Sequence, residues 1–183
     1  ATPTGYLSTV LDNQGNETAT LVASGSNRVY VTIDEIPLDL QHAFVAIEDA
    51  RFYEHNGIDI TGIVRAGITG ITSGRFSQGA STITQQLLKN NVFTDWTSES
   101  SFADKMERKI QEQYLAIQLE KVEDKDWILE NYLNTINLGQ NTLGVQAASQ
   151  RYFNKDVSEL TLSECAVIAG ITQNPSRYNP VSN

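Results

Sequence analysis

The sequence predicts a mainly α-helical domain with a small β hairpin or ribbon at its N-terminus. Short β-rich pieces alternate with turn residues as far as Ile33, and from Pro37 onward the apolar residues recur at helical spacing. Of the 183 residues, 40% are hydrophobic and 19% are charged, a balance typical of soluble globular proteins. We therefore expect one domain over residues 1–183, with a β-rich segment at 1–36 and a helical body at 37–183.

The N-terminal segment contains three β-rich pieces: Leu7 to Leu11, Thr18 to Val22 and Arg28 to Ile33. Turn-forming residues from Asp12 to Asn16 follow the first piece. Two β-rich pieces separated by such a turn favour a hairpin or ribbon.

The first two helices are predicted between Pro37 and Ser73. The first has Asp39 as its N-cap and an apolar face of Leu40, Ala43, Phe44 and Ile47. The second, Asp59 to Ser73, also carries an apolar stripe but contains interior glycines, each costing about 1 kcal/mol relative to alanine. We expect this second helix to be frayed.

Three later helices have clearer signals. A long one carries the stripe Met106, Ile110, Tyr114 and Ile117, and Asp124 can cap the next, which contains Trp127, Ile128, Tyr132 and Leu133. Thr161 and Glu164 form a capping box that opens a final apolar helix from Cys165 to Ala169.

The charge and cysteine content exclude several classes of function. The formal net charge of −9 argues against a general nucleic-acid surface, so an anionic ligand requires a local basic pocket. No run of 18 apolar residues is present to span a bilayer. The single Cys165 lies among apolar residues and reads as an inert buried thiol, and the sequence offers no dedicated zinc site.

A polar cluster from Glu48 to Gly57 follows the first predicted helix. A solvated helix end would explain such a run of charges. However, Glu48 directly follows the apolar-face residue Ile47. Partial burial there would increase the affinity of the carboxylate for a proton, as a general base requires. Both interpretations stay open from the pattern alone.

Three further polar segments have both a functional and a structural interpretation. The run Gly79 to Asn90 places hydroxyls and amides at a helix start, which suits an oxyanion or phosphate but also a capped polar helix. Arg108 and Glu112 have the spacing of a surface ion pair. The stretch Lys125 to Asn134 reads mainly as a core helix.

Taken in order, these segments resemble glycosyltransferase family 51, the peptidoglycan polymerase domain of class A penicillin-binding proteins and monofunctional transglycosylases. The resemblance runs from about Asp34 to Pro180. Its motifs are Glu48-Asp49-x-x-Phe52-x-x-His55-x-Gly57, Gly79-x-Ser81-Thr82-Ile83-Thr84-Gln85-Gln86-x-x-Lys89-Asn90, Arg108-Lys109-x-x-Glu112 and Ile128-Leu129-Glu130-x-Tyr132-Leu133-Asn134.

The resemblance implies a lysozyme-like helical fold and polymerisation of lipid II into β-1,4-linked glycan, with inversion and release of undecaprenyl pyrophosphate. Glu48 is then the base that deprotonates the acceptor hydroxyl, and Glu112 supports the donor side. The residues expected to bind the substrate are Asp49, Arg51, Phe52, His55, Ser81, Thr82, Gln85, Gln86, Lys89, Arg108 and Lys109. No metal ligand is assigned and no cofactor is required, although Mg²⁺ or Mn²⁺ could assist at the pyrophosphate.

The same resemblance implies partners and a location. The stretch from Ile58 to Gln78 would be a mobile flap that faces the membrane and accepts lipid. We expect lipid II and the growing glycan chain as partners, the membrane surface as a third, and a transpeptidase domain C-terminal to Asn183. Nucleic acid is not expected. The location would be the bacterial cell envelope, at the outer face of the cytoplasmic membrane, with the anchor absent from this stretch.

Two other functions remain open from the sequence. A lysozyme-like hydrolase also uses paired carboxylates, and activity on polymeric glycan without a lipid carrier would favour it. A catalytically inactive module that binds cell wall is the second, and binding without turnover would favour that one.

Overall fold

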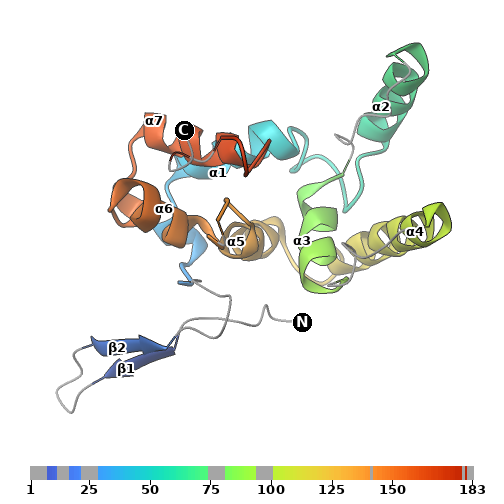
Figure 1. Ribbon diagram of the computed structural model, residues 1–183. Coiled ribbons are helices and arrows are strands. Elements are labelled where there is room, and N and C mark those ends of the chain that lie inside the picture. Colours follow the sequence, from blue (N-terminus) through green and yellow to red (C-terminus); the bar gives the residue numbers. More distant parts are fainter. Residues whose placement is uncertain are drawn as a thin grey trace. The chain divides into compact units, whose positions relative to one another are not determined.

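The computed structural model describes residues 8–11, 17–21, 29–73, 81–93, 101–140, 142–178 and 180. The described part is mainly helical, as the sequence predicts (Figure 1). The α-helices are α1 (Leu38–Glu48), α2 (Ile60–Ser73), α3 (Ile83–Asn91), α4 (Phe102–Leu119), α5 (Lys125–Thr135), α6 (Val145–Phe153) and α7 (Leu162–Ile171). Among the described residues, the short 3₁₀ turns Ile33–Glu35 and Val157–Glu159 precede α1 and α7.

The described N-terminal residues form two short strands. β1 (Ser8–Leu11) and β2 (Glu17–Leu21) pair antiparallel, with Ser8 opposite Leu21. The register shifts between Val10 and Leu11, where the pairing becomes irregular.

The helical part divides into two compact units. One consists of residues 44–132, and the other of residues up to 43 together with 133–183. The division falls within α1 and within α5, so each of these helices contributes residues to both units. All the site residues predicted from the sequence, Glu48 to Glu112, belong to the unit 44–132.

The unit 44–132 has a core of large apolar side chains. Phe44, Phe52, Ile83, Ile128 and Tyr132 are fully buried, and Phe44 and Tyr132 meet edge to face with ring centroids 6.2 Å apart. Helices α3 and α4 pack side by side in this unit (Figure 1). The second and third polar segments of the sequence are therefore neighbours.

The other unit is stabilised by apolar packing and by hydrogen bonds between a side chain and the backbone. Leu40, Leu138 and Ile168 are buried in it. The Asn134 side chain accepts a hydrogen bond from the Val31 backbone N–H at 2.9 Å and donates one to the Val31 carbonyl at 2.8 Å. This pair of bonds fixes the chain that leads into α1 against the end of α5.

Two predictions about α1 are corrected by the structure. The helix begins at Leu38, directly after Pro37, so Asp39 lies in its first turn and is not the cap. Leu40 and Phe44 are buried as expected, but Ile47 is 38% exposed. Glu48 therefore does not follow a buried side chain, and its hydrogen-bond partner Gln86 comes from α3.

The predicted frayed helix is a continuous one in the structure, because α2 extends from Ile60 to Ser73. Its N-terminus is capped by Asp59, whose carboxylate accepts the Gly62 backbone N–H at 2.9 Å. Val64 and Ile68 on this helix are exposed. Residues 74–78 of the predicted flap lie outside the described residues, and its mobility stays a prediction.

The apolar stripe predicted on α4 does not face the core. Met106, Ile110 and Tyr114 are all exposed, Ile110 at 61%, whereas the helix buries Glu112 and Ala116. The face of α4 that packs inward therefore carries the predicted site residues.

The local capping signals are confirmed. Asp124 accepts the Trp127 backbone N–H at 2.8 Å, and Thr161 and Glu164 exchange the two bonds of a capping box at the start of α7. Cys165 is buried in α7, and burial raises the pKa of its thiol. Among the described residues, no helix combines the length and apolar character that a membrane crossing requires.

Candidate active site

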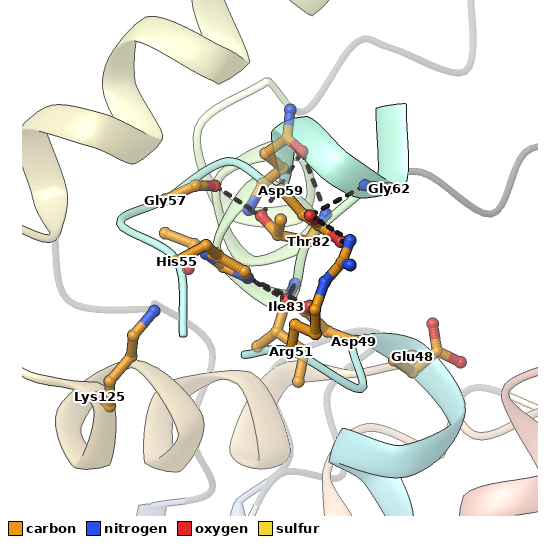
Figure 2. A network of polar contacts seen from close by, with 12 residues as sticks. Glu48, Asp49, Arg51, His55, Gly57, Asp59, Gly62, Thr82, Ile83 and Lys125 are labelled. Atoms are coloured by element: carbon orange, nitrogen blue, oxygen red, sulfur yellow. Dashed lines mark hydrogen bonds and ion pairs between the residues drawn. The ribbon is translucent and has the colours of Figure 1, made fainter. Parts of the chain in front are cut away.

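Asp49 joins the first motif to the start of α3. Its buried carboxylate accepts the Ile83 backbone N–H at 3.0 Å and lies 2.9 Å from His55 Nε2 (Figure 2). A carboxylate at a helix N-terminus satisfies a backbone donor and complements the helix dipole. Asp49 therefore fixes the end of α1 relative to α3.

Phe52 and His55, predicted to bind the substrate, are interior residues. Phe52 is fully buried, and its ring meets that of His55 edge to face at 6.2 Å. Lys125 Nζ lies 4.4 Å from the Phe52 ring centroid, close enough for a cation–π contact. Phe52 and His55 therefore anchor the loop after Glu48 in the interior of the unit.

Arg51 is paired with the residue that caps α2. Its guanidinium donates to both carboxylate oxygens of Asp59 at 2.5 Å (Figure 2). Although burial would raise the pKa of Asp59, the Arg51 guanidinium and the Gly62 N–H together lower it. The hydrogen bond to Asp59 likewise raises the pKa of Arg51. Arg51 is thus a permanent cation held against the start of α2.

The start of α3 is a capping box. Thr82 accepts the Gln85 backbone N–H, and the Gln85 side chain accepts the Thr82 N–H at 3.0 Å. The Thr82 hydroxyl also donates to the Gly57 carbonyl at 2.7 Å. Both side chains are buried, and the Thr82 hydroxyl and Gln85 Oε1 serve the local structure, as the capped-helix interpretation of this segment proposed, whereas Gln85 Nε2 has no partner among the described residues.

Glu48 lines a cavity of about 200 Å³. In Figure 2 its carboxylate points away from the Asp49 and Arg51 network. The cavity also contains Arg51, Arg65 and Ser81, two cations and a hydroxyl that can bind an oxygen-rich ligand, beside the carboxylates of Asp49 and Asp59. The complete lining is Ala46, Ile47, Glu48, Asp49, Ala50, Arg51, Asp59, Arg65, Ser81 and Thr82.

A basic cluster on α4 adjoins this cavity through Ser81. Lys109 Nζ donates to Ser81 Oγ at 2.7 Å and to Glu112 Oε2 at 3.0 Å. Arg108 forms an ion pair with the other oxygen of Glu112. The Glu112 side chain is only 1% exposed, so this carboxylate is a buried anchor that holds two cations in place.

Lys89 on α3 lies within electrostatic reach of both predicted catalytic carboxylates. Burial lowers the pKa of its ammonium, and the Lys109 and Arg108 charges lower it further. Glu112 and Glu48 act on it in the opposite direction. The structure therefore groups Glu48, Glu112 and three cations of α3 and α4 around one region of the unit.

A hydrogen-bonded chain reaches Glu48 from the core. Gln86 Nε2 donates to Glu48 Oε2 at 2.9 Å, and the Tyr132 hydroxyl donates to Gln86 Oε1 at 3.3 Å. Burial raises the pKa of Tyr132 well above its ordinary value, and the Glu48 and Asp49 charges add to this.

A second buried network, which the sequence interpretation missed, connects α3 to the junction of α4 and α5. The Glu120 carboxylate accepts the Thr84 hydroxyl at 2.5 Å and Lys125 Nζ at 2.6 Å. Lys125 in turn lies over Phe52. The junction between α4 and α5 therefore holds both the first motif and α3.

The predicted site residues fall into three groups. Glu48, Asp49, Arg51, Ser81 and Thr82 line the cavity, whereas Gln86, Lys89, Arg108, Lys109 and Glu112 form the adjoining cluster. Phe52, His55 and Gln85 lie behind them. In the described part of the chain, no three His, Cys, Asp or Glu side chains lie close enough together to hold a metal ion.

Arg65 and Asp59 are cavity residues that the sequence interpretation missed. Asp59 is the first residue of the predicted helix 59–73, the position of a capping residue. Arg65 gave no signal because the helical pattern of that segment depends on its apolar residues. The spacing of Arg65 from Glu48 carries no local signal either, because the two residues lie on different helices, α2 and α1.

Comparisons with known proteins give relatives over nearly the whole chain. Penicillin-binding protein 1A of Clostridium perfringens is 50% identical over 179 residues, which is 96% of this chain and 25% of that protein. Penicillin-binding protein 1A of Escherichia coli is 50% identical over 154 residues, covering 84% of this chain and 17% of that protein. Penicillin-binding protein 1F of Bacillus subtilis is 46% identical over 174 residues, covering 95% and 23%.

The chain thus spans a quarter or less of the length of these relatives. The family described as Transglycosylase matches residues 14–183, a range that includes every cavity and cluster residue described above. On this evidence the chain belongs to the transglycosylase family.

Proposed function

We propose that this chain is a peptidoglycan glycosyltransferase that polymerises lipid II into β-1,4-linked glycan strands, with inversion at the anomeric carbon and release of undecaprenyl pyrophosphate. One observation carries the proposal: Glu48 lines the same cavity as Arg51, Arg65 and Ser81 in a chain of the transglycosylase family. This arrangement places a base beside cations that suit a phosphorylated substrate.

The proposed reaction is a single displacement. Glu48 takes the proton of the acceptor 4-hydroxyl while that oxygen forms a bond to the anomeric carbon of the donor. The bond between this carbon and the pyrophosphate oxygen breaks, and the pyrophosphate leaves with the electron pair. Because attack and departure occur on opposite faces, the α-linked donor becomes a β-1,4 product.

The basic residues would stabilise the negative charge that builds on the leaving group. Preorganised cations at such a position stabilise the transition state more than they stabilise the ground state, and the barrier therefore falls. Lys109 and Arg108 suit this role because Glu112 holds both of them at fixed positions. Glu112 then acts on the donor side as an anchor for cations. Arg51 and Arg65 would bind phosphate or sugar oxygens within the cavity.

The remaining motif residues would position the site. Asp49, His55 and Phe52 hold the loop after Glu48, and the capping box of Thr82 and Gln85 fixes the start of α3. Their burial supports this role over direct contact with substrate. A divalent cation, if it assists, would be bound chiefly through the pyrophosphate.

The wider setting is part of the same proposal. We expect a lysozyme-like fold, a membrane-facing role for the segment that includes α2, and a location at the outer face of the cytoplasmic membrane. The exposed apolar side chains of α2 support contact with lipid. The relatives are named penicillin-binding proteins and are at least four times longer than the matched region, which supports an additional transpeptidase domain.

The substitution Glu48→Gln tests the function. The amide has nearly the same shape but accepts no proton, so we expect polymerisation of lipid II to fall by a factor of about 10² to 10⁴. Glu54→Gln, on the exposed part of the same loop, is the matched control and should keep the wild-type rate. Wild-type polymerisation by the Glu48→Gln variant would refute the assignment.

The same assay separates the two other functions. Cleavage of polymeric glycan without a lipid carrier would favour a hydrolase, and binding of glycan without turnover would favour an inactive module. Parallel reactions with Mg²⁺, Mn²⁺ and EDTA determine whether a divalent cation assists.

A further inference from the structure

Three residues from three helices form a chain of side-chain hydrogen bonds that ends on the proposed base. Tyr132 comes from α5, Gln86 from α3 and Glu48 from the end of α1. The Tyr132 hydroxyl donates to Gln86 Oε1 at 3.3 Å, and Gln86 Nε2 donates to Glu48 Oε2 at 2.9 Å. All three residues belong to the unit 44–132.

The donor and acceptor groups of the three side chains fix the direction of both hydrogen bonds. An ionised carboxylate only accepts hydrogen bonds, so the Gln86 amide must turn its NH₂ group toward Glu48. Its carbonyl then faces Tyr132, which must donate. Tyr132 has a fully buried side chain, and burial raises the pKa of its phenol well above the ordinary value. The phenol therefore keeps its proton throughout the working pH range.

Removing the phenol hydroxyl would release this constraint on Gln86. The amide could then rotate and turn its carbonyl oxygen toward the carboxylate, so that two acceptors would face each other. An N–H donor favours the ionised form of a carboxylate, and losing it favours the protonated form. A general base that holds a proton is inactive.

We propose that Tyr132 is a positioning residue for the reaction, which acts through the Gln86 amide to keep Glu48 oriented and ionised. The proposal rests on the proposed function, in which Glu48 is the base. It assigns a role in the chemistry to a residue that otherwise reads as part of the apolar core.

Among the described residues, the charged groups that line the cavity with Glu48 are Asp49, Arg51, Asp59 and Arg65, and Lys89 on α3 interacts with it electrostatically. None of them contributes to the hydrogen bond between Tyr132 and Gln86. Tyr132→Phe leaves each of these charges in place and keeps the ring that packs against Phe44. A change in the pH profile of this variant therefore reports on the hydrogen-bonded chain.

The experiment measures kcat and KM for lipid II polymerisation between pH 5 and pH 9 in the intact protein. For Tyr132→Phe we expect kcat on the acid side of the profile to fall about three- to tenfold, with KM within about twofold of wild type. The acid limb of the kcat profile should move by about 0.5 to 1 pH unit toward alkaline pH. Much of the loss would then be recovered at high pH.

Two further variants separate positioning from simple stability. Tyr152→Phe removes another phenol hydroxyl, one that donates to the Leu138 carbonyl at 2.7 Å, and should leave the acid limb unchanged. Gln86→Met removes the N–H donor itself and should move the limb in the same direction. Adding Tyr132→Phe to Gln86→Met should cause little further change, because both substitutions break one chain.

An acid limb that stays at the wild-type position in both Tyr132→Phe and Gln86→Met would overturn the inference, even if stability falls. Additive effects in the double variant would also overturn it. These failures are distinct from failure of the proposed function, which would appear as a wild-type protein that does not polymerise lipid II, and from failure of the base assignment, which would appear as wild-type polymerisation by Glu48→Gln.

Discussion

The Asp49 carboxylate accepts a hydrogen bond from the Ile83 backbone N–H at 3.0 Å, although the two residues lie 34 positions apart in the sequence. This contact fixes the position of the residue before it, Glu48, relative to α3. Because α3 also carries Gln86 and Lys89, the same bond sets the base against its hydrogen-bond donor and a nearby cation.

Asp49→Asn should destabilise the fold. An asparagine has one acceptor oxygen and an NH₂ donor, so it removes the negative charge at the start of α3 and one of the two oxygens that face His55 Nε2. We expect the free energy of unfolding to fall by about 1 to 3 kcal/mol, the usual cost of leaving a buried polar group unsatisfied. Urea unfolding measures this, with the exposed Asp126→Asn as the control. If Asp49→Asn and Asp126→Asn lost the same free energy of unfolding, the contacts of Asp49 would contribute no more to stability than an exposed carboxylate does.

Glu112→Gln should affect stability and substrate affinity more than the chemistry. The variant leaves Arg108 and Lys109 without their buried counter-charge, and breaking such a pair typically costs about 3 to 5 kcal/mol. We expect a lower melting temperature and a raised KM for lipid II, with the acid limb of the kcat profile unchanged. Glu107→Gln, on the exposed side of α4, is the control.

A different result would restore direct catalysis to Glu112. If Glu112→Gln kept wild-type stability and KM while kcat collapsed, the carboxylate would have to contact reacting atoms. Its 1% exposure argues against that outcome, because a substrate can reach only groups that the fold leaves accessible.

The sequence predicted the local features of the fold well. The cap at Asp124 and the capping box at Thr161 depend on residues three positions apart, and both formed as expected. The buried residues of α5 were also predicted, because Ile128, Tyr132 and Leu133 recur at helical spacing, and all three are buried. Such signals are contained within one element.

The errors arose where tertiary contacts decide. The apolar stripe of α4 resembles a core face, yet Ile110 and Tyr114 are exposed while Glu112 is buried between two cations. A buried carboxylate with paired charges cannot be distinguished from a surface ion pair by its spacing. The motifs named most site residues, but only the folded chain separates those that line the cavity from Phe52, His55 and Gln85 behind it.

Lys89→Arg should change the alkaline limb of the kcat/KM profile. Burial and the neighbouring Lys109 and Arg108 lower the pKa of Lys89 below its ordinary value of 10.5, so its charge is lost at lower pH than for an exposed lysine. A neutral amine no longer attracts a pyrophosphate, and activity should fall as pH rises through that value. A guanidinium stays charged, so the limb should move to higher pH in the variant.

Each profile for Lys89→Arg is normalised to its own maximum, because the two side chains differ in shape. Lys105→Arg, on an exposed part of α4, should reproduce the wild-type limb. An alkaline limb at the same pH in Lys89→Arg and wild type would mean that another group titrates there.

Gly57→Ala should strongly destabilise the protein, whereas Gly170→Ala should not. Gly57 has φ +88°, and a Cβ there would lie 2.5 Å from the backbone carbon of Ala116 in α4. Left-handed backbone costs an alanine about 1 to 2 kcal/mol, and overpacking against rigid backbone adds about 1 to 3 kcal/mol. At Gly170, within α7, no atom lies within 4 Å of the added Cβ, so better helix propensity should raise stability by about 0.5 to 1 kcal/mol. Urea unfolding of the two variants gives opposite signs if the loop after Glu48 packs directly on α4. A Gly57→Ala variant as stable as wild type would show that this loop can move away from α4, and the close packing between them would then be wrong.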